Sequence, residues 1–153
     1  MAVEEDQDHI EKVVELNAPV ERVWRALTDH EEFGEWFRVR LDGPFRVGET
    51  TRGKMTFPGH EHVEWISQTE RMEPESLFAF SWPPSAVDPD TEYAGDAKVL
   101  VEFRIESTSS GTRLTIRESG FLQFPESKRL EILRSNVEGW EIQARNVTAH
   151  VSG

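Results

Sequence analysis

The sequence contains no cysteine and a single tyrosine, and it has no long hydrophobic run. Without cysteine the chain cannot form disulfides, thiolate metal sites or a cysteine nucleophile, which agrees with a reducing compartment. No apolar stretch approaches the roughly 20 residues that a membrane-spanning helix needs. The first residues, MAVEEDQD, also lack the basic and apolar regions of a secretory signal peptide. We therefore expect a cytoplasmic protein with no stable membrane association.

Basic residues are scarce: 17 lysines and arginines stand against 29 acidic residues, which gives a net charge of −12. Such a balance repels the phosphate backbone, so nucleic acid is not an expected partner. Hydrophobic residues make up 37% of the chain and charged residues 30%, as in ordinary globular proteins. A length of 153 residues suits one domain, and we expect residues 1–153 to form it.

The stretch from residue 10 to residue 37 predicts a strand, a turn and two short helices. Residues 11–16 mix apolar and charged side chains as a half-exposed strand does, and Pro19 stops the strand and suits a first helical turn. Thr28 and Glu31 have the spacing of a capping box, which predicts that the second helix begins there. The apolar stripe of the first helix is Val20, Val23, Trp24 and Leu27, and the second helix carries Phe33, Trp36 and Phe37.

The middle of the chain has the pattern of consecutive antiparallel strands. Turn residues separate them, and residues 85–96 are expected to be a loop with four acidic residues. The expected strands are 38–41, 49–57, 60–72 with a bulge, 77–82, 97–105 and 112–119. In the fifth of these, alternation places Ala97, Val99, Val101, Phe103 and Ile105 inward and Lys98, Glu102 and Arg104 outward; in the last, Leu114 and Ile116 point inward.

Residues 125–151 change to a helical period. Apolar residues are spaced there by threes and fours, and at 1.5 Å per residue the helix would be about 40 Å long. The stripe is Leu130, Leu133, Val137, Trp140, Ala144, Val147 and Val151. The expected architecture is therefore an α+β helix-grip fold, a curved antiparallel β-sheet wrapped around a long C-terminal α-helix, with two short helices after the first strand.

Four segments, taken in order, resemble a known superfamily. They are LNAPVERVWRALTDHEEFGEWF, VEWISQTERMEPESLFAFSW, GTRLTIRESGF and EGWEIQARNV. Their order and spacing are similar to those of the START and birch-pollen-allergen helix-grip superfamily, in the subgroup of heat-shock protein 90 ATPase activator homologues. This resemblance implies an apolar cavity between the sheet and the last helix. It also implies that the protein binds or transforms a hydrophobic small molecule.

The sequence departs from this family pattern at polar positions. Glu118 stands where relatives often have a histidine before Ser-Gly-Phe, and Gln143 and Asn146 stand where relatives often have leucines. A carboxamide on the last helix would give the cavity a polar contact, so a purely apolar ligand is less favoured.

Aromatic side chains are the candidate walls of the cavity, because they bring large apolar area with few rotamers. Ordinary core packing is the alternative for each of them, since pockets and cores use the same residue types. Asn136 and Gln143 flank the apolar stripe of the last helix and are the expected polar contacts, the alternative being that they face water at its margin. The candidate ligand-binding residues are Trp36, Phe37, Trp65, Phe78, Phe80, Trp82, Phe103, Asn136, Trp140 and Gln143.

The sequence shows little sign of a metal or catalytic centre. His60, His62 and Glu64 would share one face of a strand, but a solvated outer face explains them better than a metal site. We expect no metal and no cofactor. The side chains available for acid or base chemistry are Glu64, Glu102, Glu118, Arg104, His30 and Tyr93, and no spacing among them defines a catalytic pair. Nucleophile and phosphate-binding motifs are absent.

Three functions remain open. The first is the binding of a small, mostly hydrophobic, potentially aromatic molecule in the cavity. The second is a cochaperone that stimulates the heat-shock protein 90 ATPase, which follows from the subgroup alone. The third is an enzyme similar to the polyketide cyclases and aromatases, which are thought to steer a reactive intermediate by shape. An exposed edge strand would also permit a homodimer.

Overall fold

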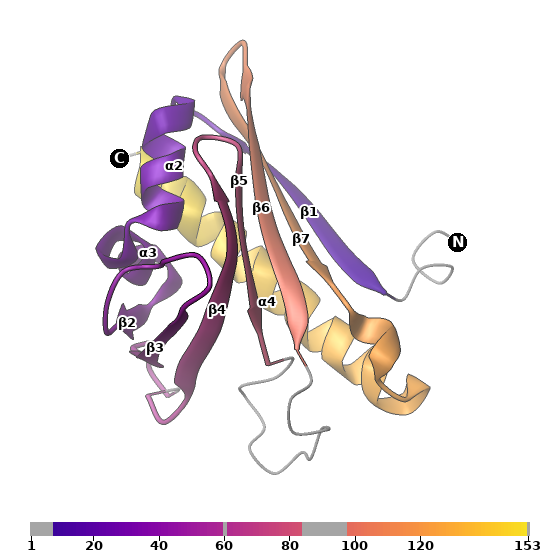
Figure 1. The fold of residues 1–153 in the computed structure, drawn as a ribbon. Helices are drawn as coiled ribbons and strands as arrows, with labels where there is room; N and C mark the ends of the chain where they lie inside the picture. The colour runs from indigo at the N-terminus through magenta and orange to yellow at the C-terminus, as the bar shows by residue number, and fades with distance from the viewer. Residues whose placement is uncertain (1–7, 60, 84–97, 153) are drawn as a thin grey trace.

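The computed structural model describes residues 8–59, 61–83 and 98–152. This part of the chain forms seven strands and three α-helices, and Figure 1 shows how they are arranged. The strands are β1 (His9–Leu16), β2 (Val39–Leu41), β3 (Thr50–Met55), β4 (Glu64–Glu73), β5 (Leu77–Trp82), β6 (Val99–Thr108) and β7 (Gly111–Ser119). The helices are α2 (Val20–Thr28), α3 (His30–Phe37) and α4 (Glu126–Ser152), with a short 3-10 helix, η1 (Phe121–Gln123), before α4.

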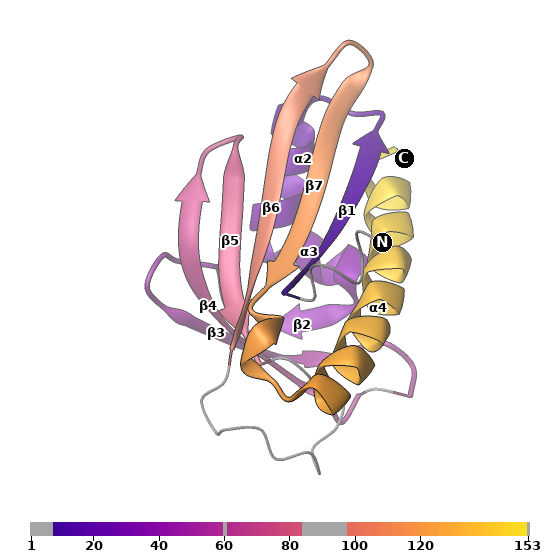
Figure 2. The ribbon, with the colours of Figure 1, turned by 90° about the vertical axis from the view of Figure 1, so that its right-hand side faces the viewer.

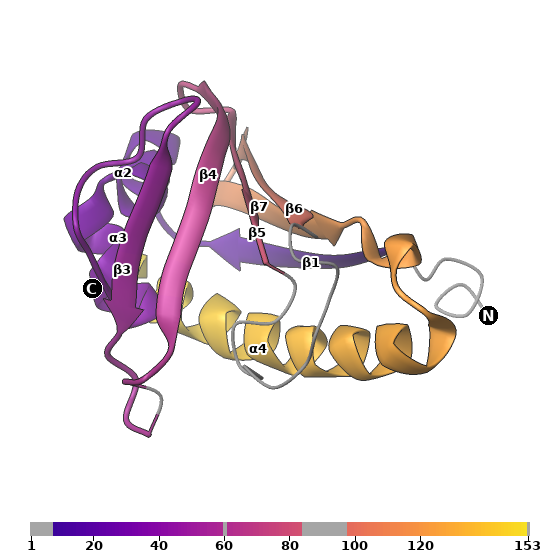
Figure 3. The ribbon, with the colours of Figure 1, turned by 60° about the horizontal axis from the view of Figure 1, so that its bottom comes forward.

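All seven strands form one antiparallel sheet in the order β1-β7-β6-β5-β4-β3-β2. The first strand therefore pairs with the last, and the sheet runs back in sequence order to β2 at the other edge. Figures 2 and 3 show α4 running along one face of the sheet, with α2 and α3 near its C-terminal end. This arrangement is the expected helix-grip α+β fold.

The two short helices follow the prediction except for the cap between them. Thr28 is the last residue of α2, and its Oγ1 donates to the carbonyl of Trp24 at 2.7 Å. Asp29 is the N-cap of α3: one of its carboxylate oxygens accepts from the backbone N–H groups of Glu31 at 2.9 Å and Glu32 at 3.2 Å. The predicted Thr28–Glu31 capping box is thus wrong, because the aspartate one residue later satisfies the same orphan N–H groups.

The strands follow the predicted order, but several bounds differ: the strand expected at 60–72 is β4 (Glu64–Glu73), and the strand expected at 97–105 is β6 (Val99–Thr108). His62 therefore lies in a turn before β4 and, contrary to the expectation, does not share a strand face with Glu64. Strand β5 has the expected bounds, 77–82, and β4 carries a register shift between Thr69 and Arg71, within the strand where a bulge was expected. The inward residues of β6 and β7 are buried as predicted, and Glu102 and Arg104 form an ion pair of 3.1 Å on the outer face. The predictions for His60, Tyr93, Ala97 and the loop 85–96 lie outside the described residues.

Helix α4 buries a different stripe in its first half from the one predicted. Leu130 is 44% exposed and Val137 is 42% exposed, whereas Ile132 is buried. Each residue turns a helix by about 100°. The buried face of α4 is therefore turned away from the predicted stripe, toward Asn136 and Gln143, both of which are half-buried. The three-and-four spacing located the helix correctly but misplaced the centre of its inner face.

Among the described residues, no helix is long and apolar enough to cross a membrane.

Candidate ligand site between the sheet and the C-terminal helix

The site is centred on a carboxylate that strand alternation carries into the interior. Leu114, Ile116 and Glu118 occupy alternate positions of β7, and all three side chains are buried. Glu118 is 0% exposed. Its cross-strand neighbours are Ile10 on β1 and Val101 on β6, both of which are apolar and buried. Glu118 is therefore a single acidic group in an apolar row of the inner face.

Three neutral donors hold the Glu118 carboxyl group. Its Oε1 accepts from the indole Nε1 of Trp140 at 2.8 Å and from Nδ2 of Asn136 at 3.0 Å. Its Oε2 accepts from the indole Nε1 of Trp82 at 2.7 Å. Burial raises the pKa of Glu118 above its ordinary value, and the hydrogen bonds from Trp140, Trp82 and Asn136 offset only part of that effect. Helix α4 and strands β5 and β7 thus meet at one carboxyl group.

Aromatic rings surround this carboxyl group. They come from α3, from β4, β5 and β6, and from α4, and the centroids of contacting pairs lie 5.2 to 6.3 Å apart. We call this set the aromatic cluster; its members are Phe37, Trp65, Phe80, Trp82, Phe103 and Trp140. Trp82 is half-buried, and the other five rings are buried. Trp82 is therefore the most exposed ring of the aromatic cluster.

Two other predicted wall residues, Trp36 and Phe78, lie at the margin of the cluster. The Trp36 ring contacts Phe33 and Phe37, and its Nε1 donates to the carbonyl of Ala26 at 2.8 Å. The Phe78 ring contacts Phe45 as well as Phe80 and Phe103. In this structure Trp36 links α3 to α2 by a hydrogen bond, and Phe78 packs against Phe45, which is not part of the aromatic cluster.

The two predicted carboxamides face inward and have different partners. Asn136 donates to Glu118, as described above. Gln143 donates from Nε2 to the carbonyl of Phe37 at 3.1 Å, and its Oε1 accepts from Nδ2 of Asn146 at 3.1 Å. Gln143 therefore holds the end of α3 against α4, next to a ring of the aromatic cluster.

A second buried polar group lies in the same row of the sheet as Glu118. The strand registers connect Glu118 to Val101, Val101 to Phe80, and Phe80 to Thr69. Three strand spacings separate the two ends of this row, about 14 Å along the sheet. Thr69 is 0% exposed, and its Oγ1 has no hydrogen-bond partner among the described residues. Such buried, unpaired polar atoms are rare in native proteins.

The other candidate groups lie away from this interior. His62 and Glu64 are exposed, and among the described residues no cluster of three acidic, histidine or cysteine side chains could hold a metal ion. Two surface grooves are present: one beside the turn at Asn17–Ala18–Pro19, and one between β1 and α4 that includes Val13 and Ala144. Neither groove is lined by the aromatic cluster.

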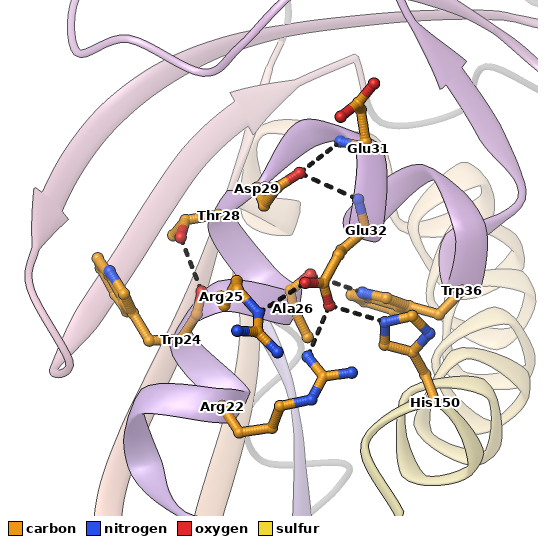
Figure 4. A network of polar contacts seen from close by, with 10 residues as sticks. All are labelled: Arg22, Trp24, Arg25, Ala26, Thr28, Asp29, Glu31, Glu32, Trp36 and His150. Carbon is orange, nitrogen blue, oxygen red and sulfur yellow. Dashed lines mark hydrogen bonds and ion pairs between the residues drawn. The ribbon is translucent and has the colours of Figure 1, made fainter. Parts of the chain in front are cut away.

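A network of charged groups, shown in Figure 4, joins the C-terminal end of α4 to α2 and α3. The Glu32 carboxylate accepts from Arg22 at 2.6 Å and Arg25 at 2.7 Å, and it contacts Nε2 of His150 at 3.0 Å. Burial alone would raise the pKa of Glu32, but the bonds from His150 and Arg22 and the charges of both arginines outweigh it, so this pKa is lowered. The network fixes the position of α3, which carries Phe37.

Sequence comparison identifies one family model, described as Activator of Hsp90 ATPase homolog 1-like protein, which matches residues 17–152. No curated protein matches the chain.

Several solved structures share the fold. Protein MLL2253 from Mesorhizobium loti is 22% identical with a TM-score of 0.72, covering 94% of this chain and 96% of its own. Protein NE0264 from Nitrosomonas europaea is 20% identical with a TM-score of 0.74, covering 95% of each chain. DynU16, a putative protein in the dynemicin biosynthetic locus, is 22% identical with a TM-score of 0.64 over 90% of this chain and 46% of its own. At these identities the likeness concerns the fold.

Proposed function

This chain belongs to the family of Activator of Hsp90 ATPase homolog 1-like proteins, and from that premise we propose that it binds a small, mostly hydrophobic molecule between the sheet and α4. One observation carries the proposal. A buried carboxyl group, Glu118, lies among aromatic rings, and its hydrogen-bond partners within the part of the chain that the structure describes are neutral side chains. A polar group that merely filled a core would be costly there, whereas a ligand pocket needs a few polar groups within apolar walls.

The unpaired hydroxyl of Thr69 supports the same proposal. It lies on the inner face, one strand from Phe80 of the aromatic cluster, and has no partner among the described residues. A hydrogen bond to a ligand would satisfy it. Glu118 and Thr69, at the two ends of the row across β7, β6, β5 and β4, then orient a molecule whose body lies along Val101 and Phe80.

Binding requires a ring to move, because the rings of the cluster contact one another. Trp82 is the ring that can move at least cost, since it is half-buried at the end of β5 while the other five rings are buried. Trp82 turns outward to admit the ligand and then packs over it, so that the ligand lies between Trp82 and the rings of Phe37, Trp65 and Trp140.

The test is a titration with N-phenyl-1-naphthylamine, a neutral dye that fluoresces in apolar surroundings. We expect saturable binding of one dye per chain. Trp82→Leu should weaken it by about 10- to 150-fold, because a lost aromatic contact of about 1.5 to 3 kcal/mol corresponds to roughly those factors. Val13→Ser is the matched control, since Val13 is 51% exposed and lies in the groove between β1 and α4. Weakening by Val13→Ser but not by Trp82→Leu would contradict the proposal.

A natural ligand can be identified by native mass spectrometry of protein purified from its own source. The expected result is a co-purifying small molecule that is released by unfolding and is absent from Trp82→Leu.

An enzyme of the cyclase type is a second candidate, and Glu118 favours it. Its raised pKa allows the carboxyl group to keep a proton closer to neutral pH, as a general acid must. Conversion of the co-purified molecule during incubation, lost in Glu118→Gln, would support this candidate. Recovery of the molecule unchanged from the wild-type protein would exclude it.

Activation of heat-shock protein 90 is a separate proposal, supported by the family description alone. It predicts that this protein raises the ATPase rate of the purified chaperone. An unchanged rate at excess protein would contradict it.

A further inference from the structure

Among the described residues, Glu118 has no charged partner. Each of its hydrogen bonds comes from an uncharged group: the indoles of Trp82 and Trp140 and the amide of Asn136. Its neighbours across the strands, Ile10 and Val101, are apolar. Among the described residues, the ion pairs of the protein involve other side chains, and none of them includes Glu118. When Glu118 is ionised, its carboxylate therefore has no counterion among the described residues, and a bound cation would supply one.

The Oε2 oxygen has room for a further donor. A carboxylate accepts about four hydrogen bonds, two on each oxygen. From the residues that the structure describes, Oε1 accepts two bonds, from Trp140 and Asn136, whereas Oε2 accepts one, from the half-buried Trp82. When the Trp82 indole moves aside, Oε2 is the oxygen that a ligand reaches.

The two indoles bonded to this carboxyl group, and the Phe37 ring that contacts both of them, favour positive charge. Phe37, Trp82 and Trp140 form a triangle with centroids 5.9, 6.2 and 6.3 Å apart. Aromatic faces attract cations within about 6 Å of their centroids, and the attraction grows when water is excluded. The net charge of −12 acts in the same direction at long range, because it draws cations toward the protein.

We propose that the ligand is an organic cation, a protonated amine on an aromatic or otherwise apolar body. The proposal rests on the function proposed above and names the chemical class of its ligand. The ammonium group donates to Oε2 of Glu118, and the apolar body packs against Phe37, Trp65 and Phe80. The ammonium charge stabilises the ionised carboxylate, which burial disfavours in the empty protein.

The test compares two probes of the same shape, 2-(2-naphthyl)ethylamine and 2-(2-naphthyl)ethanol, by isothermal titration calorimetry. The amine should bind at least about tenfold more tightly than the alcohol, the factor that one charge-assisted hydrogen bond supplies. In Glu118→Gln this preference should fall to about onefold. Glu64→Gln is the matched control, because it removes an equal charge from an exposed position and should keep the preference.

A second measurement uses the unaltered protein and therefore does not depend on the folding of the variant. The affinity for the amine should increase as the pH rises through the pKa of Glu118, because only the ionised carboxylate pairs with ammonium. The affinity for the alcohol should stay constant over the same range.

The outcomes separate this inference from the proposed function. Equal binding of amine and alcohol, or tighter binding of the alcohol, overturns the cationic class and leaves the ligand-binding function intact. Failure of both naphthyl probes in a protein that binds the neutral dye also overturns the cationic class alone. Failure of all three molecules overturns the function as well.

Discussion

At the scale of single residues, Glu118 shows how a strand period can place a charge in a core. It alternates with Leu114 and Ile116 on β7, so it points inward with them. Two indole N–H groups and one amide then take the place of the water that it loses. Isolated buried charge is expensive, and this cost appears as a raised pKa.

The raised pKa predicts a specific dependence of stability on pH. The folded protein binds the Glu118 proton more tightly than the unfolded chain, in which the pKa is near 4.5. Its contribution to stability is therefore complete below that pH and is lost as the pH rises through the folded pKa. The free energy of unfolding of Glu118→Gln, relative to wild type, should increase over this window.

Urea denaturation at a series of pH values measures this difference. The exposed Glu64→Gln serves as the control for the loss of one negative charge. A difference between Glu118→Gln and wild type that stays constant with pH would show that Glu118 is not perturbed by burial.

At the scale of elements, α3 is the part whose placement the site depends on, because it carries Phe37 to the cluster. Three contacts fix it: Gln143 bonds to the carbonyl of Phe37, Trp36 bonds to Ala26 of α2, and Glu32 joins the charged network. Helix α3 then passes into β2 through Arg38, whose φ of 70° is left-handed. A helix of eight residues needs such tertiary contacts to persist.

The close approach of α3 to β2 predicts opposite effects for two glycine substitutions. A Cβ atom on Gly34 would lie 2.3 Å from the carbonyl oxygen of Val39, whereas one on Gly139 would meet nothing within 4 Å. Gly34→Ala should destabilise the fold by about 1 to 3 kcal/mol through overpacking. Gly139→Ala should stabilise it by about 0.5 to 1 kcal/mol through helix propensity. Thermal unfolding measures both, and shifts of the same sign would contradict this packing.

The network at Glu32 gives a second prediction at this scale. Because the pKa of Glu32 is lowered in the folded protein, Glu32 contributes to the free energy of unfolding at pH values above 4.5, its ordinary pKa. This contribution is lost as the pH falls through the pKa of the folded state. Glu32→Gln should lower the free energy of unfolding at neutral pH by about 1 to 2 kcal/mol, a value discounted for partial exposure to solvent.

The neighbouring Glu31 supplies the control, because both residues lie in the first turn of α3 and share its dipole. Glu31→Gln should change the stability by less than about 0.5 kcal/mol. Equal losses for the two variants in chemical denaturation would assign the effect to the helix dipole and not to the network.

At the scale of the whole molecule, one sheet places the first strand beside the last. Strand β1 pairs with β7, and α4 packs against β1, α2 and α3. Buried side chains from all three helices and from the strands belong to one cluster. We propose on this basis that residues 1–153 form a single domain.

A single domain predicts one cooperative unfolding transition. Tryptophan emission follows the core and far-ultraviolet circular dichroism follows the backbone, and the two denaturation curves should coincide. Separate midpoints for the two signals would contradict the single-domain proposal.

Local patterns were sufficient for the fold. The period of two in β6 and β7, the Pro19 turn and the helical spacing near the C-terminus each reflect chemistry within a few residues. The cap of α3 was missed because Asp29 and Thr28 are both good capping residues, and the local sequence does not choose between them.

The site was less predictable. Alternation with Leu114 and Ile116 is enough to place Glu118 inward, but the sequence does not show which side chains bond to it. Its bonds join β5, β7 and α4, residues up to 36 positions apart in the chain. A sequence pattern that extends over a few neighbouring residues cannot predict such a contact. The rotation of α4 that exposes Val137 and turns Asn136 inward is likewise set by the surface on which the helix packs.

The sequence by itself determined the order of strands and helices, the long final helix and the wealth of aromatic residues, because propensity and periodicity act over a few neighbouring residues. Only the tertiary structure decided that six rings, two amides and one carboxyl group meet between the sheet and α4. The reason is physical: the burial and pKa of Glu118 depend on side chains that only the closed sheet and its helix bring together.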